Sequence, residues 1–396
     1  MADVCTFRRV NTPVDHQTDE VFNIQSQERA NLLSEIKDAI QSSTVKAPLW
    51  ACMQVCDISK LRELVTAARN SPAMFSLFNN TCLSIPLRWM QHPPLDHVSS
   101  TPSTLSSAEI SAHSDQRHRR VKPKTLAKER DRYSCAITEG EVFEVAHIFP
   151  HFMINTKPST NLDASIPPFW NLLDVFFEPD RLNRWRAEIF NDPSNPDKST
   201  DGCHNTICLS PTAHRLWAKA MFALRPVSLS DDRKELAVQF YWQPRPAHGC
   251  FDSVNILESP GSSRDLVRVG ANVLSIAAHD NATSAVAIKS GHIFVFRTTN
   301  PNTHPLPSFE LLDMQWHLQR IVSMSGSAEI YDEDNGDDDG DHLDAGIIHK
   351  TFSDILAWVS TPLSHSGSDD DFSRSPASIS TYPLRTIERP SKNLFC

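Results

Sequence analysis

The chain has 396 residues, of which 40% are hydrophobic and 22% charged, with 8 Trp and 20 Phe. This composition excludes a wholly disordered chain, and no stretch approaches the roughly 18 to 20 consecutive apolar residues of a membrane span. The net charge of −10 argues against nucleic-acid binding over the whole surface, but the central third differs. From Arg117 to Arg245 the chain carries 19 Lys and Arg against 16 Asp and Glu, whereas the remainder carries 19 against 32.

The nine cysteines are odd in number, scattered, and contain no Cys-x-x-Cys pair. This pattern argues against a disulfide framework and a zinc ribbon. The N-terminus lacks a charged head followed by an apolar signal core. We therefore expect an intracellular protein, in the nucleus or the cytoplasm, that is not secreted and has no membrane partner.

The first hundred residues predict a helical region, because apolar residues recur at helical spacing in two stretches. Residues 101–129 are first rich in Ser, Thr and Pro and then basic, which is typical of a linker. The basic run is a candidate phosphate contact or nuclear import signal, with a solvated linker end as the alternative. The helical stretches are Leu32, Leu33, Ile36, Ile40 and Leu61, Leu64, Val65, Ala68, and the basic candidates are Arg119, Arg120, Lys122 and Lys124.

The central part alternates short strands and helices. Tyr133 to Pro150 predicts two strands around a Glu139-Gly140 turn, the second ending near His147. Helical spacing then predicts a helical hairpin between residues 169 and 190. A short strand from Asn205 to Leu209 and a helix from Pro211 to Leu224 follow.

The C-terminal part predicts a strand from Glu235 to Trp242, a hairpin from Ala285 to Phe296 about Ser290-Gly291, and a helix from Phe309 to Met324. Glu329 to Asp344 holds nine acidic residues in sixteen, and residues 327–396 as a whole predict an acidic, disordered tail. An EF-hand calcium loop fails there, because no glutamate stands at its twelfth position. The fold class is therefore α+β.

Three central residues stand in an arrangement that suits phosphodiester hydrolysis. His147 ends a strand, Asn205 opens the next strand, and His214 follows nine residues later on a helix. Such hydrolysis needs a base, a group that orients the base, and a cation that neutralises charge on the phosphorane. One histidine can be the base, the asparagine can orient it, and the other histidine can bind the cation.

At these residues the sequence resembles the HNH (ββα-metal) nuclease family, and specifically the HNH-domain proteins of filamentous fungi. The resemblance covers roughly residues 130–326, and it implies a ββα module with a helical insert and a C-terminal β-hairpin plus helix. Its main segments are Cys135-Ala-Ile-Thr138, Ala146-His-Ile-Phe-Pro150, Phe169-Trp-Asn-Leu-Leu173, Asn205-Thr-Ile-Cys-Leu209, His214-Arg-Leu-Trp217, Phe222-Ala-Leu-Arg-Pro226 and Val238-Gln-Phe-Tyr-Trp242.

The resemblance implies a role for each site residue. His147 would be the general base, Asn205 would hold it in its productive orientation, and His214 would be a metal ligand. The divalent ion would be Mg²⁺, with Mn²⁺, Ni²⁺ or Zn²⁺ as alternatives, and the substrate would be nucleic acid, DNA before RNA.

One position departs from the family pattern. The residue before the first motif histidine is usually a metal ligand, and here it is Ala146. Glu144 lies two residues back on the same strand face and is the candidate replacement. His151 and His204 are other candidates. Ala218 also stands where many family members carry a polar or acidic residue.

Three alternatives use the same part of the chain. Cys203, His204, Cys208 and His214 together form a possible structural zinc site, although one short strand would have to present ligands on both faces. A thiol protease pair of Cys135 and His147 lacks an oxyanion or orienting motif. Trp170 and Trp185 are candidates for base stacking or for the core.

The sequence therefore predicts a metal-dependent HNH endonuclease. The alternative is a catalytically degenerate HNH scaffold that acts as a binding module for nucleic acid or protein. The predicted domain boundaries are 1–100, 101–129, 130–326 and 327–396.

Overall fold

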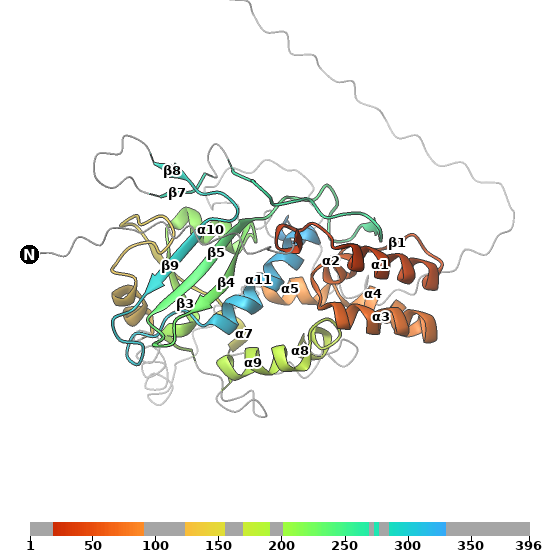
Figure 1. Cartoon of the computed structure of the whole chain (residues 1–396), viewed down its shortest axis with the longest axis horizontal. Helices are drawn as coiled ribbons and strands as arrows, with labels where there is room; N and C mark the ends of the chain where they lie inside the picture. The colour runs from red at the N-terminus through yellow and green to blue at the C-terminus, as the bar shows by residue number, and fades with distance from the viewer. Residues whose placement is uncertain are drawn as a thin grey trace, which may run out of the picture. The chain divides into compact units, whose positions relative to one another are not determined.

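The computed structural model describes residues 19–90, 123–154, 169–190, 201–268, 273–276 and 285–329 (Figure 1). Helices follow one another closely in the N-terminal part. Both predicted helical stretches are confirmed, because Leu33 and Ile36 of one helix and Leu61 and Leu64 of another are buried. The elements of this part are η1 (Asp19–Phe22), α1 (Gln27–Ile40), β1 (Thr44–Lys46), α2 (Ala47–Val55), α3 (Ile58–Asn70), α4 (Pro72–Thr81) and α5 (Ser84–Met90).

Helix α11 (Phe309–Met324) has the predicted bounds and packs against both helices and strands. It contacts α2, α5 and α9 (Pro179–Ile189) as well as β4 (Phe222–Leu229) (Figure 1). Because neighbours surround it, its polar residues are buried beside its apolar stripe. The Gln315 side-chain oxygen accepts a hydrogen bond from the Leu224 backbone N–H at 3.2 Å, and the Gln319 amide donates to the Trp217 carbonyl at 2.9 Å.

A three-stranded antiparallel sheet has the order β4-β5-β9, where β5 is Glu235–Trp242 and β9 is Ile293–Arg297. The bounds of β5 confirm the predicted strand. Phe222 of β4 pairs with Trp242 of β5, and Leu236 pairs with Phe296 of β9. The rings of Phe222 and Phe240 stack with centroids 4.7 Å apart, so aromatic residues fill the core on this sheet face.

The segment that matters for function is two antiparallel strands followed by a helix. β2 (Glu144–His147) pairs with β3 (Thr206–Leu209), with Glu144 opposite Leu209 and His147 opposite Thr206. The Ser210 hydroxyl caps α10 (Pro211–Ala218), which begins directly after β3 and contacts both strands. In the sequence between the strands lie α7 (His151–Ile154), α8 (Phe169–Leu173), α9 and the 3-10 turn η3 (Cys203–Asn205). The predicted helical hairpin is confirmed by α8 and α9.

Two sequence predictions near this segment are wrong. The first strand of the predicted hairpin before His147 does not form, because Arg132 and Tyr133 both take a φ of 55° and the Cys135 N–H closes a turn onto the Gly140 carbonyl at 2.9 Å. The helix predicted to reach Leu224 ends at Ala218, because Ala220 takes a φ of 49°. The residues from Phe222 onward pair with β5 instead.

The hairpin predicted about Ser290-Gly291 is also wrong in its pairing. β8 (Val286–Ala287) pairs with β7 (Ser275–Ile276), whereas β9 pairs with β5. The turn itself is present, because Gly291 takes a φ of 92° and its N–H bonds the Phe240 carbonyl at 2.7 Å. β5 has eight residues and β8 has two, so β9 forms a longer ladder with β5 than it could form with β8.

Several predictions fall on residues outside the described ranges. These are the acidic tail from residue 330 onward, most of the linker, and the basic residues Arg119, Arg120 and Lys122. The domain boundaries remain predictions, although β1 pairs with β6 (Ser253–Asn255) and so connects the N-terminal part to the central one. Within the described ranges, the helices are too short or too polar to cross a bilayer.

Candidate functional site

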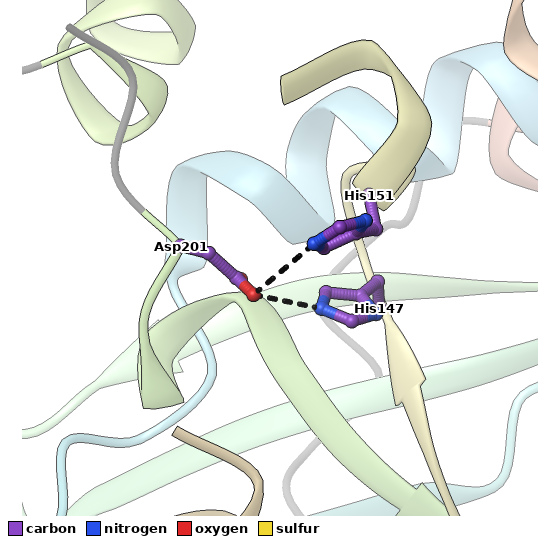
Figure 2. A group of neighbouring side chains, drawn as sticks. All are labelled: His147, His151 and Asp201. Carbon is purple, nitrogen blue, oxygen red and sulfur yellow. Dashed lines mark hydrogen bonds and ion pairs between the residues drawn. The ribbon is translucent and has the colours of Figure 1, made fainter. Parts of the chain in front are cut away.

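The last residue of β2 places an imidazole beside a carboxylate. His147 Nε2 lies 3.1 Å from Oδ2 of Asp201, which stands at the start of the chain segment leading into β3. His151, on the first turn of α7, brings its Nε2 to 4.0 Å from the same oxygen (Figure 2). The two imidazole rings have centroids 5.0 Å apart. Each side chain supplies one nitrogen or oxygen ligand atom, and these three atoms lie within 4.8 Å of one another.

The cluster of His147, His151 and Asp201 is partly shielded from solvent. The three side chains keep 15%, 31% and 19% of their surface, respectively. Burial raises the pKa of the Asp201 carboxyl, but the hydrogen bond from His147 and the charges of both imidazoles outweigh burial, so the pKa lies below its ordinary value. Asp201 is therefore ionised near neutral pH. Its second oxygen, Oδ1, is buried and has no hydrogen-bond partner among the described residues.

Asn205 is 2% exposed and clamps the chain that follows His147. Its side-chain oxygen accepts a hydrogen bond from the Phe149 N–H at 2.7 Å, and its amide nitrogen donates to the Phe149 carbonyl at 3.1 Å. Its own carbonyl accepts from the Ile148 N–H at 2.9 Å. Asn205 therefore fixes the backbone that connects His147 to His151. A hydrogen bond from its side chain also lowers the pKa of Asp201, the carboxylate that contacts His147, and its role in orienting His147 stays a prediction.

Glu144 and His214 meet on another side of the ββα segment. Nδ1 of His214, on the first half of α10, lies 2.5 Å from Oε2 of Glu144 at the start of β2. The side chains are 35% and 53% exposed. Because side chains alternate along a strand, Glu144 and Ala146 share one strand face and His147 points to the other. Ala146 is 1% exposed and offers no ligand atom.

The remaining candidates lie elsewhere. His204 Nε2 lies 3.1 Å from the Glu188 carbonyl, and Lys124 is exposed on the helical segment 123–130. Among the described residues, three metal-ligand atoms come close together at His147, His151 and Asp201, whereas those of the proposed Cys and His zinc set do not. Cys135 is buried, with its Sγ accepting from the Thr138 N–H. Trp185 is fully buried and therefore belongs to the core.

Sequence reasoning did not single out Asp201. It stands four residues before Asn205 at the end of a polar loop, where hydrophobic periodicity carries no information. His151 was noted only as a substitute ligand. The available signal was the short spacing of His147 and His151 along the chain.

Comparison with known proteins adds one finding. Residues 135–225 match the family model HNH_2, described as HNH endonuclease. The match contains β2, β3 and α10, together with His147, Asp201, Asn205 and His214. Neither the curated proteins nor the solved structures contain a match to this chain. The family resemblance of this segment is thus confirmed, and its fungal part remains a prediction.

Proposed function

We propose that this protein hydrolyses phosphodiester bonds of nucleic acid, DNA before RNA, with a divalent cation and a histidine base. One observation carries the proposal. In the segment that matches the HNH endonuclease family, the first strand ends on His147, whose imidazole is held by an ionised carboxylate. A ring oriented in this way is what a general base requires.

His147 can act as a base through one defined nitrogen. An ionised Asp201 can only accept a hydrogen bond, so Nε2 of a neutral His147 carries the proton at their 3.1 Å contact. Nδ1 then keeps its lone pair and takes a proton from the attacking water. Asp201 stabilises the imidazolium that results, and Asn205 limits movement of the strand end through the Phe149 backbone.

The donor set of Glu144 and His214 fits a divalent cation. A carboxylate and an imidazole are suitable ligands for several divalent ions and do not select strongly among Mg²⁺, Mn²⁺, Ni²⁺ and Zn²⁺. Both side chains are accessible, which leaves coordination positions for water and substrate. When bound, the ion supplies charge neutralisation at the phosphorane and the leaving oxygen. We propose Mg²⁺ as the ion used.

A second ion placement uses His147, His151 and Asp201. The three ligand atoms of these residues lie close enough to hold one ion, and Oδ1 of Asp201 has no hydrogen-bond partner among the described residues. This placement would turn His147 from a base into a ligand, because a nitrogen that binds a cation cannot accept a proton. We place the catalytic ion on Glu144 and His214, because this placement leaves His147 free to act. Since Glu144 and His147 point to opposite faces of β2, this placement requires the scissile phosphate to lie at the end of the strand, within reach of both.

The nucleic-acid contact proposed for the basic run rests on its charge. Lys124 is exposed, and Arg119, Arg120 and Lys122 precede it in the sequence. Lysine and arginine side chains at such density bind phosphates and release counterions.

Plasmid cleavage tests the proposal. Full-length protein is incubated with supercoiled plasmid and with single-stranded DNA in Mg²⁺, Mn²⁺, Ni²⁺ or Zn²⁺, alongside His147→Ala and His214→Ala. We expect metal-dependent nicking that falls at least about 100-fold in His147→Ala, since general base catalysis contributes roughly 10²- to 10⁴-fold. The variants must keep the wild-type circular dichroism spectrum.

The chain offers a matched control for His214. His304 Nε2 lies 2.8 Å from Glu129, and the two side chains are 27% and 43% exposed, so this pair resembles the Glu144 and His214 pair but lies outside the site. His304→Ala should cleave as the wild type does. Cleavage that persists in His147→Ala would reject the catalytic proposal.

The buried Ala146 favours a second candidate function. Because this strand position supplies no ligand, the chain is also compatible with an HNH scaffold that binds nucleic acid or protein without hydrolysing it. This candidate predicts a folded protein that binds DNA in the presence of a chelator and cleaves in none of the four metals.

A further inference from the structure

A hollow of about 270 Å³, including the space open to solvent, lies beside the C-terminal ends of α10 and α11. Three of its lining residues are cations, Lys219, Arg245 and Arg268, and none of its lining residues within the described part of the chain is acidic. Lys219 follows α10, and Arg245 lies three residues beyond the end of β5. Separate segments thus bring positive charge to one place.

Arg268 has an unsatisfied donor in this hollow. One of its terminal nitrogens donates to the Gln243 carbonyl at 2.7 Å, and its guanidinium carbon lies 5.5 Å from the centre of the Trp242 ring. Its Nε is buried and has no hydrogen-bond partner among the described residues. A buried donor without an acceptor costs free energy, so an acceptor that enters the hollow would be stabilising.

The charges of the two arginines favour an anion, and they act against the negative C-terminal ends of α10 and α11 beside the hollow. Burial and the neighbouring charge of Arg245 both lower the pKa of the Arg268 guanidinium. The charges of the half-buried Arg268 and the exposed Arg245 repel each other, and an anion between them reduces the repulsion. Arginine presents a planar fork of donors that matches phosphate and carboxylate oxygens.

We infer that this hollow binds a phosphate group of a nucleic-acid backbone, which rests on the proposed nuclease function. The location favours a phosphate over other anions. Lys219 stands five residues after His214, which corresponds to about 7.5 Å along a helix axis. A strand whose scissile phosphate lies at the ββα segment therefore has neighbouring phosphates within reach of the hollow.

The salt dependence of DNA binding tests this inference independently of cleavage. All variants carry His147→Ala, the buffer contains a chelator, and the dissociation constant of a fluorescent DNA is measured from low to high salt. Arg245→Gln and Lys219→Gln should each reduce the slope of log K against log salt by about 1, the loss expected for one phosphate contact. Arg268→Lys, which keeps the charge, should leave the slope unchanged, and Arg268→Gln should reduce it.

Arg297→Gln is the matched control. Arg297 of β9 pairs with Glu235 of β5 at 2.9 Å and does not line the hollow. Removing the charge of Arg297 should therefore leave the slope unchanged. Equal slopes in the hollow variants and the control would overturn the inference. In that case the three cations would be assigned to another acidic group, such as the acidic run that follows Ala328 in the sequence.

Different measurements can reject the phosphate site and the nuclease proposal. Absence of DNA binding by the wild-type chain overturns the phosphate site, whereas the nuclease proposal is decided by metal-dependent nicking. Thermal melting of each variant checks the fold. A variant with an unchanged melting temperature and a reduced slope has lost a phosphate contact, whereas a lowered melting temperature indicates a damaged fold.

Discussion

Asn205 and Phe149 are joined by two hydrogen bonds, one in each direction, between the Asn205 side chain and the Phe149 backbone. The pair connects the turn before β3 to the turn after β2. It therefore fixes the path of the chain between His147 and His151.

Replacement of Asn205 by Ala should lower both stability and activity. The change leaves the Phe149 N–H and carbonyl without their partner in a buried place, which costs about 1–3 kcal/mol per unsatisfied group. We expect the free energy of unfolding in urea to fall by that order, and nicking to fall with it. A fully stable Asn205→Ala protein without activity would instead indicate direct contact with the reacting groups.

Arg130 should be one of the most sensitive positions of the ββα segment. Its guanidinium donates to the carbonyls of Cys203, Thr206 and Pro305, and pairs with Asp131 at 2.7 Å. Removing one partner of a buried ion pair costs about 3–5 kcal/mol, so Arg130→Leu should lower the urea midpoint strongly.

Arg69 provides the control for Arg130. It also pairs with a carboxylate, that of Glu35 at 2.7 Å, but both side chains are about half exposed. Arg69→Leu should cost no more than about 1 kcal/mol, the range of surface ion pairs. Equal losses in the two variants would contradict the role given to the Arg130 network.

Stability should fall on acidification because of His317. Burial lowers the pKa of His317 from 6.5 to about 4, despite the nearby Asp313 carboxylate. Between these values the unfolded chain binds a proton that the folded chain does not bind. The free energy of unfolding should therefore decrease as the pH falls from 6.5 to 4, by at most about 1.4 kcal/mol per pH unit from this group.

A variant with no titratable ring tests this assignment. In His317→Gln, the unfolding free energy measured by urea titration at several pH values should lose that part of its slope between pH 6.5 and 4. The variant will be less stable overall, because the ring packs on Phe177 and Trp185 with centroids 5.3 and 5.8 Å away. The slope, and not the absolute stability, decides the outcome.

His151 separates the two ion placements. If the ion lies on Glu144 and His214, His151→Ala should keep metal-dependent nicking within about tenfold of the wild type, whereas His214→Ala should lose it. Loss of a ligand or its support typically costs 10- to 100-fold in metal affinity, which calorimetric titration with Mn²⁺ measures directly. Weaker Mn²⁺ binding in His151→Ala, with His214→Ala unaffected, would move the ion to the His147 cluster.

Several elements could be predicted from the spacing of neighbouring residues alone. The helix Phe309–Met324, the strand Glu235–Trp242 and the helices around residues 169–190 follow from apolar periodicity, which is a property of neighbouring residues. The ordered motifs also located the HNH segment, which the match of residues 135–225 confirms.

Contacts between residues distant in the sequence could not be predicted, because they depend on the three-dimensional fold. Strand pairing depends on competition between partners distant in sequence, so it assigned β9 to β5 and prevented a hairpin with β8. The same holds at the site, where Asp201 reaches His147 across 54 residues and the Asn205 side chain binds the Phe149 backbone. Hydrogen bonds are fixed by three-dimensional distance and direction, and sequence spacing constrains neither one across an inserted helical segment.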